Sequence, residues 1–219
     1  MLHKNKISFK KISVSRSPYS EEEIKEKKIK LHTDLNINDS KNFNHDNVVS
    51  FDESFMSIQK LTKEREWAKL GVRACRKING RRIRQGKSML LAISNKKTIA
   101  HKLIKGSVNG EHIYNFLINE VIKDKKGITI LLDNARTHHY KKLKDKIKET
   151  GNTLAFNIPY HPQYNPVEYI NNIVKADLKK QYIEDINKLD SKLNKIVNKI
   201  DESIYRNCFN HAYKCIMTL

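Results

Sequence analysis

Cysteine and long apolar runs are scarce in this 219-residue sequence, and each shortage excludes a class of protein. Three cysteines, Cys75, Cys208 and Cys215, are too few for a disulfide framework, so we expect a reducing compartment. No apolar run approaches the length of a membrane span, which predicts that no membrane is a partner. The N-terminus is charged and lacks the apolar core of a signal peptide, so we expect the protein not to be secreted.

Positive charge is in large excess. The sequence has 43 Lys and Arg against 24 Asp and Glu, a formal net charge of +19, which favours a polyanionic partner such as nucleic acid. Six of the nine arginines fall in one short stretch, and guanidinium groups match phosphate geometry well. This clustering indicates a phosphate-contacting segment, with a solvated loop as the alternative. The six are Arg65, Arg73, Arg76, Arg81, Arg82 and Arg84.

Residues 1–46 are predicted to be a leader rather than a domain, because they offer too few apolar residues to fold alone. Ser20 followed by Glu21, Glu22 and Glu23 predicts the start of a helix that runs to about His32. An Asn-rich loop follows. We therefore expect one folded domain over residues 47–219.

Five segments are predicted to be strands. Two of them are apolar runs that end on a carboxylate, the first on Asp52 and the second on Asp133. The second run does not alternate with polar residues, so we expect both of its faces to be covered, as in the centre of an α/β sheet. Two other segments flank a polar turn and predict a β-hairpin. The five segments are residues 47–51, 88–93, 98–104, 128–132 and 153–158.

Helical periodicity appears in three later regions. One helix opens at Gly110, and a Lys-rich helix runs from about His139 to Thr150. From Pro166 to the end the pattern is helical throughout. Strands therefore come first, then alternate with helices, and then give way to helices. This order predicts an α/β fold: a mixed five-stranded sheet with helices on both faces and a helical C-terminal tail.

Three acids, Asp52, Asp133 and Glu168, are the candidate catalytic and metal-binding residues. Ligands of α/β sheets bind at the carboxyl ends of strands, where two of these acids are expected, and the third begins a helix that would pack beside them. Converging carboxylates repel one another unless a cation neutralises them. Oxygen donors alone favour Mg²⁺ or Mn²⁺, and two such ions about 4 Å apart catalyse phosphodiester chemistry.

Each acid also has an ordinary structural explanation. Asp52 fits a turn residue at a strand end, and Asp133 fits an Asx turn or a helix cap. Glu168 lies three residues after Asn165, with Pro166 at the first helical position, which fits a capping box. A capped helix is also a rigid mount for a ligand, so this explanation and the functional one are compatible.

Two segments resemble the catalytic core of mariner-type transposases and of their bacterial insertion-sequence relatives, which use an Asp-Asp-Glu triad. They are residues 131–138, which include Asp133, and residues 159–168, which end on Glu168. In one large branch of that family 34 residues separate the second Asp from the Glu, and here positions 134 to 167 do so. Asp52 resembles the family's first acid, because Asp-Glu-Ser follows an apolar strand. Weaker resemblances to the family lie at residues 67–71 and 105–109.

The resemblance implies an RNase H-like (retroviral integrase-like) fold and a DNA transposase activity. Phosphodiester bonds at transposon ends would be hydrolysed, and the freed 3′-hydroxyl would attack target DNA. Asp52 and Asp133 would hold Mg²⁺ or Mn²⁺, with Asp52 shared between two ions and Glu168 completing the second site. The implied partners are transposon-end and target DNA and a second copy of the chain, as a homodimer on DNA. The expected location is wherever the DNA is, in cytoplasm, nucleoid or nucleus.

Several basic side chains are candidate DNA contacts. Arg136 follows Asp133 closely and is interpreted as a partner of DNA phosphate or of a carboxylate. His138 is a candidate contact to phosphate, although histidines after a strand are common on surfaces. The complete set of candidate DNA-binding residues is Arg73, Arg76, Arg81, Arg82, Arg84, Arg136 and His138.

The sequence departs from the family at its start. Family members carry helix-turn-helix domains roughly one hundred residues upstream of the first Asp, and only 51 residues precede Asp52 here. Residues 1–46 are therefore expected to be a linker remnant that follows a missing helix-turn-helix region. The alternative function is a truncated, catalytically silent DNA-binding remnant or regulator of transposition. A host nuclease such as a junction resolvase fits the context of Glu168 less well.

Two smaller features allow more than one interpretation. Cys208, His211 and Cys215 offer three zinc ligands, but buried thiols in a terminal helix are the simpler interpretation. Trp67, the only tryptophan, fits a core anchor better than a platform for a DNA base.

Overall fold

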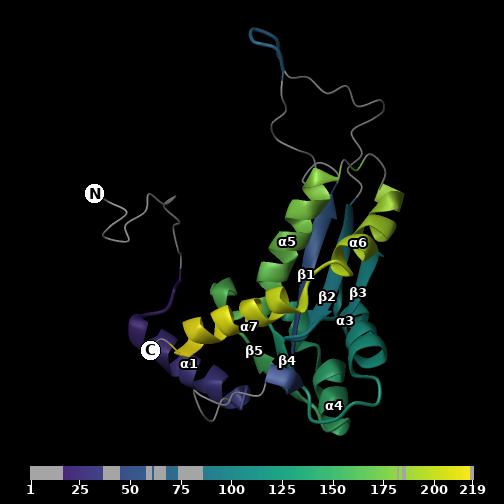
Figure 1. Cartoon of the computed structure of the whole chain (residues 1–219). Coiled ribbons are helices and arrows are strands. Elements are labelled where there is room, and N and C mark those ends of the chain that lie inside the picture. The colour runs from purple at the N-terminus through teal and green to yellow at the C-terminus, as the bar shows by residue number, and fades with distance from the viewer. Residues whose placement is uncertain are drawn as a thin grey trace, which may run out of the picture.

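A five-stranded mixed sheet forms the centre of the molecule (Figure 1). The computed structural model describes residues 17–36, 45–57, 61, 68–73, 86–181, 183 and 186–217. The strand order is β3-β2-β1-β4-β5, antiparallel from β3 to β1 and parallel from β1 to β5. This confirms the predicted mixed sheet and its hairpin. The strands are β1 Val48–Ser57, β2 Gly86–Ile93, β3 Thr98–Lys105, β4 Thr129–Leu132 and β5 Thr153–Phe156.

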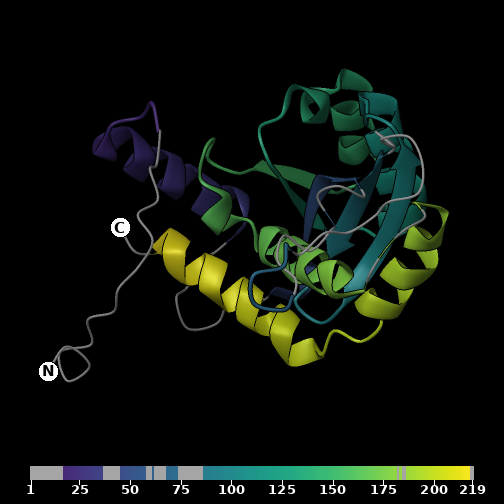
Figure 2. The same ribbon diagram turned by 90° about the horizontal axis from the view of Figure 1, so that it is seen from above.

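Helices cover both faces of the sheet, as expected (Figure 2). One face carries α5 Pro166–Lys180, α6 Leu189–Val197 and α7 Glu202–Met217. The other carries α3 Gly110–Phe116, its π-helical continuation Leu117–Ile122 and α4 Lys141–Glu149. Short 3₁₀ turns span His45–Asn47, Arg136–His139, Pro162–Tyr164 and Ile186–Lys188. No helix among the described residues is both long and apolar enough to cross a membrane.

The first helix, α1 Glu21–Asp34, starts as the sequence predicts. Ser20 and Glu23 form a reciprocal capping box, with the Glu23 N–H donating to the Ser20 hydroxyl at 3.2 Å. Leu31 and Leu35 are buried in the core cluster that also contains α5 and α7. The helix therefore docks on the domain that follows it, and the proposed boundary at residue 46 stays a prediction.

The central strand β1 divides its side chains between two cores. Val48 and Met56 belong to the core under α5, α6 and α7, whereas Val49 and Phe51 belong to the core under α3 and α4. Because successive side chains of a strand alternate between faces, Asp52 is directed to the α5 face.

Asp52 lies inside β1 and not at its end, which corrects the sequence prediction. Strand β1 continues to Ser57, because β2 pairs with it as far as the Ser57–Gly86 pair. On its other edge, β1 pairs with the short strand β4 only from Val48 to Ser50. Ser50 lies opposite Leu131, so continuing this register by two residues brings Asp52 opposite Asp133. The early end of β4 thus places the first two acids side by side.

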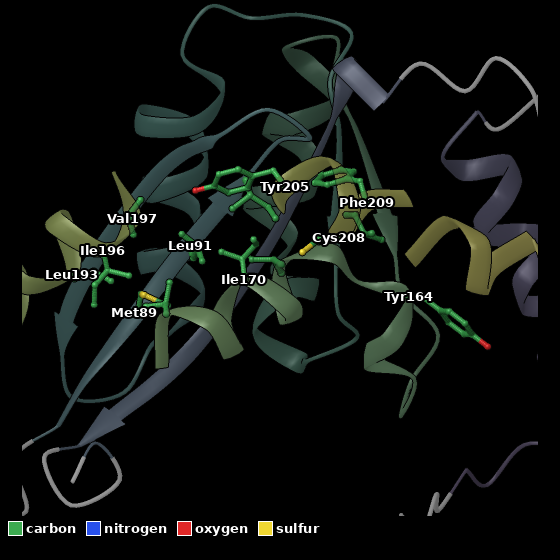
Figure 3. Packing of buried hydrophobic residues seen from close by; sticks show 14 of the residues in the cluster. Met89, Leu91, Tyr164, Ile170, Leu193, Ile196, Val197, Tyr205, Cys208 and Phe209 are labelled. Carbon is green, nitrogen blue, oxygen red and sulfur yellow. The ribbon is translucent and has the colours of Figure 1, made fainter. Parts of the chain in front are cut away.

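The core beneath α5 anchors the helix that carries the third acid (Figure 3). Ile170 points from α5 toward Met89 and Leu91 of β2. Residues of α6 and α7 close the same cluster, Tyr205 and Phe209 among them. Ile170 is fully buried and lies two residues after Glu168, so packing holds the first turn of α5 in place.

Candidate active site

A hydroxyl from β1 holds the start of α5, and with it Glu168. A proline occupies the first helical position, as predicted, but the side chain of Asn165 makes no cap hydrogen bond to the helix. The predicted capping box of Asn165 and Glu168 is therefore wrong. Instead, the Ser50 hydroxyl accepts a hydrogen bond from the Val167 N–H at 3.0 Å and donates one to Asn165 Oδ1. Since Ser50 precedes Asp52 by two residues, one face of β1 positions both acids.

Asp52 is nearly buried, with 7% of its surface exposed. Asn171 donates from Nδ2 to Asp52 Oδ2 at 2.8 Å, and it lies one helical turn after Glu168 on α5. Burial, followed by the charges of three nearby carboxylates, raises the pKa of Asp52 from 3.8 to about 8. Those carboxylates belong to Glu168, Glu53 and Asp133.

Asp133 follows the end of β4 in a turn. Its Oδ1 accepts a hydrogen bond from the Ala135 N–H at 2.9 Å and also pairs with His138 Nδ1, so the Asx-turn explanation is correct. Burial acts to raise the pKa of Asp133, but the hydrogen bonds from His138 and Ala135 outweigh it and lower that pKa. Asp133 is therefore a carboxylate at neutral pH, and neither of these contacts uses Oδ2.

His138 is fully buried, which corrects its assignment as a DNA contact. Its Nε2 lies 2.7 Å from Glu53 Oε2, and its Nδ1 pairs with Asp133, so both ring nitrogens are used inside the protein. The ring also packs edge-on against Phe51 at 5.7 Å. Burial acts to lower the pKa of His138, but hydrogen bonds to Asp133 and Glu53 raise it to about 10. His138 is thus a buried imidazolium that joins the strand carrying Asp52 to the turn carrying Asp133.

The chemistry of the three acids fits a hard divalent cation. Burial raises the pKa of Glu168. The positive charge of Lys175 acts to lower that pKa, and the negative charge of Asp133 acts to raise it further, so these two acids interact electrostatically. A cation would relieve the repulsion that raises the pKa of Asp52, and carboxylate oxygens suit Mg²⁺ or Mn²⁺. In the described part of the chain, no group of three or more His, Cys, Asp or Glu side chains is spaced as a formed metal site. The three carboxylates are thus suitable donors by their chemistry, although their side chains do not form a closed metal site.

A groove of about 470 Å³ opens beside two of the acids. Asp133 and Glu168 both line it, together with the loop between β5 and α5. Tyr160 from that loop and Tyr19 from the segment before α1 line the same groove. A ligand bound at Asp133 and Glu168 would therefore also meet aromatic side chains.

Two of the candidate DNA-contacting arginines lie among the residues that the structure describes. Arg73 and Arg136 are exposed, and Arg136 opens the 3₁₀ turn that also carries His138. Their exposure is compatible with contacts to DNA, and these two contacts stay predictions. Four others, as well as Arg65 and Trp67, lie outside the described residues; the four are Arg76, Arg81, Arg82 and Arg84.

The cysteines and histidine of α7 do not form a zinc site within the described residues. Cys208 is buried in the core, and burial raises the pKa of its thiol. Cys215 Sγ lies 3.9 Å from His211 Nε2, but no third ligand joins this pair among the described residues. The interpretation as buried thiols holds for Cys208.

Three residues of the site were missed from the sequence: Ser50, Glu53 and Asn171. Glu53 follows Asp52 directly, and Asn171 lies at the i+3 position from Glu168, so adjacency and helical spacing were available signals. Ser50 had no local signal, because its partners lie more than a hundred residues away.

This fold and these acids define a class: RNase H-like proteins whose carboxylates suit metal-dependent phosphodiester chemistry. The family model described as DDE superfamily endonuclease matches residues 47–190. The chain belongs to this family, which confirms the resemblance inferred from the sequence. No curated protein sequence matches the chain at a significant level.

Solved structures of the Mos1 mariner transposase share the fold. The pre-cleavage Mos1 transpososome matches with a TM-score of 0.74 and 16% identity over 98% of this chain and 68% of the other. The Mos1 paired end complex with Mn matches with a TM-score of 0.76 and 15% identity, covering 98% and 66%. The isolated Mos1 catalytic domain matches with a TM-score of 0.66 and 15% identity, covering 91% and 95%. The chain thus spans about two thirds of the Mos1 chains in those complexes and nearly all of the catalytic domain.

Proposed function

We propose that this chain is a transposase catalytic domain that hydrolyses phosphodiester bonds at transposon ends and joins the freed 3′-hydroxyl to target DNA. One observation supports this most directly. Asp52 in the middle of β1, Asp133 after the end of β4 and Glu168 at the start of α5 lie near one another, and the charges of Glu168 and Asp133 both act to raise the pKa of Asp52. Family membership adds the expectation of endonuclease chemistry.

Two Mg²⁺ or Mn²⁺ ions would be held by these acids, Asp52 between both, Asp133 at one and Glu168 at the other. When bound, such ions activate the attacking oxygen and stabilise the leaving oxygen. The protein's part is to hold the ligands: His138 holds Asp133, and Asn171 holds Asp52. Mos1 structures have been solved with Mg and with Mn, which supports the choice of ion.

DNA is the proposed substrate, and a second copy of the chain is the proposed protein partner. The net charge of +19 supports the first, with Arg73, Arg136 and the arginines near residue 80 as proposed phosphate contacts. Paired-end complexes of Mos1 support the second by analogy.

The test is Mg²⁺-dependent cleavage of DNA that carries the element's ends, with a helix-turn-helix protein supplied in trans if needed. Asp133→Ala and Glu168→Ala should each lower the cleavage rate by at least about a hundred-fold, because each removes a metal ligand. Asp145→Ala, which removes an exposed acid from α4, is the matched control and should keep the rate. Cleavage that survives Asp133→Ala or Glu168→Ala would disprove the assignment.

The alternative is a catalytically silent protein that binds DNA through its charge. The family match and the convergence of three acids do not favour it. Titration calorimetry separates the two functions: tight DNA binding without any heat of Mg²⁺ or Mn²⁺ binding would support the silent protein.

A further inference from the structure

The loop before α5 contains a tyrosine at a backbone position that favours glycine. The His161 N–H donates to the Ile158 carbonyl at 3.2 Å, Pro159 comes second in this four-residue turn, and Tyr160 comes third with φ of 63°. Proline followed by a positive φ is the pattern of a type II β-turn, whose third residue is usually Gly or Asn. A bulky aromatic residue in this conformation is strained by on the order of 1 kcal/mol.

Hydrogen bonds on both sides of Tyr160 impose this conformation. Asn157 donates from Nδ2 to the His161 carbonyl at 2.9 Å, and its Oδ1 accepts from the Ile158 N–H at 2.8 Å. His161 Nδ1 lies 2.8 Å from the Pro159 carbonyl, and its buried ring stacks on Tyr164. The turn is therefore rigid, and the strain at its third residue is built in.

The ring of Tyr160 adds little to the stability of the fold that would offset this strain. The residue is 69% exposed, and within the described residues it has no hydrogen bond, ion pair or ring contact. The backbone strain at Tyr160 costs stability, and the exposed ring contributes little burial to offset that cost. Its use therefore lies outside the folded chain.

The position of Tyr160 indicates what that use is. The ring lines the same groove as Asp133 and Glu168, the two acids proposed to act on a DNA strand. An exposed aromatic face on a rigid loop stacks with a base of any type, because every nucleobase has a π-face. A base can take this position only after it leaves the duplex stack.

We propose that Tyr160 is a stacking platform for an unpaired base of the DNA strand that lies at Asp133 and Glu168. This inference rests on the proposed function in one respect, that DNA is the substrate. The platform positions the strand next to the acids and takes no part in the chemistry. Because the turn is already rigid, binding of DNA does not have to order a flexible loop, which would cost affinity.

The test measures DNA binding by the full chain without divalent metal, so that cleavage cannot contribute. The probes are a duplex with a short single-stranded extension that carries a fluorescent purine analogue, and a blunt duplex of the same sequence. Tyr160→Gly should weaken binding of the extended duplex about ten-fold and abolish the change in analogue fluorescence. Binding of the blunt duplex should change little.

Two matched variants and a stability measurement complete the test. Tyr160→Phe keeps the ring and should bind both duplexes as the unchanged chain does. Ile29→Ala removes an exposed apolar side chain from α1 and should also leave binding unchanged. The thermal midpoint of Tyr160→Gly should stay the same or rise, because glycine suits a positive φ.

Three results would overturn the platform: unchanged binding in Tyr160→Gly, an equal loss for both duplexes, or a loss accompanied by a lower thermal midpoint. The last would assign Tyr160 to the fold. Failure of the proposed function would show elsewhere, as cleavage that does not need Asp133 or Glu168, since the binding assay involves no cleavage.

Discussion

At the scale of single residues, the site consists of carboxylates in two different states. Asp133 is kept ionised by the His138 imidazolium and a backbone N–H. Asp52, by contrast, is buried among negative charges, and its pKa of about 8 means that it is protonated over much of the neutral range when no cation is bound. Asp52 is therefore the acid whose ionisation lowers the stability of the fold most.

Asp52→Asn should raise the stability of the metal-free protein at alkaline pH. The pKa of Asp52 is raised from 3.8 in the unfolded chain to about 8 in the folded one, so folding binds a proton between these values. Its contribution to stability thus falls as pH rises from about 4 to about 8. The variant should exceed the wild type by on the order of 3 kcal/mol at pH 8 in urea unfolding and match it near pH 4.

The control for this measurement is Asp145→Asn, an exposed acid on α4, which should show no such pH-dependent gain. Addition of Mg²⁺ to the wild type should narrow the difference at pH 8, because a cation offsets the repulsion. An Asp52→Asn variant that is less stable than the wild type at pH 8 would contradict this account.

At the scale of elements, the decisive contact joins the centre of β1 to the first turn of α5. The Ser50 hydroxyl satisfies the Val167 N–H, one of the helix's unpaired donors, in place of a local cap. The same hydroxyl holds the side chain of Asn165, which is 1% exposed. Strand and helix are thus linked directly behind the acids they carry.

Ser50→Ala should destabilise the protein and displace Glu168. The loss of a cap and of the hydrogen bond to a buried amide should cost about 1–3 kcal/mol in chemical unfolding. Cleavage should fall as well, because the mount of Glu168 loosens. Ser54→Ala removes another buried hydroxyl from the same face of β1, one that makes no hydrogen bond to α5 within the described residues, and it is expected to keep cleavage. Equal effects of the two variants would rule out a specific role for the Ser50 cap.

At the scale of the whole molecule, the net charge of +19 favours a polyanionic partner, such as the DNA proposed as substrate. The chain has 43 Lys and Arg against 24 Asp and Glu, while the three candidate catalytic acids lie near the middle of β1, the end of β4 and the start of α5. The excess positive charge draws in a polyanion from a distance, and the acids would tolerate it only with cations between them.

DNA binding should therefore depend steeply on salt. The association constant is expected to fall roughly a hundred-fold between about 50 and 200 mM salt, because bound phosphates release counterions. Arg136→Gln should lower the slope of log K against log salt by about one. Arg206→Gln, whose guanidinium is already paired with Glu202 at 2.6 Å, is the matched control and should keep the slope. A shallow salt dependence would contradict binding through phosphates.

Local patterns in the sequence were sufficient for most of the fold. The apolar run that ends on Asp133, the proline that starts α5 and the Ser20–Glu23 start of α1 each act over a few residues, and all were predicted correctly. The prediction that β1 ends at Asp52 was wrong. The strand continues to Ser57 because β2 pairs with it, and this pairing cannot be read from the apolar pattern of β1 alone.

By itself the sequence determined which three acids are candidates, their spacing and the elements that carry them. The apolar runs and the proline that indicate them are local features of a few neighbouring residues. Only the tertiary structure decided that Ser50 caps α5 across 117 residues, and that His138 turns inward to Glu53 across 85. Sheet register and burial set these contacts, and both depend on how distant segments pack. The same packing directs Asp52 to α5 and Tyr160 into the groove, which is why the chemistry of the site became visible only in the folded chain.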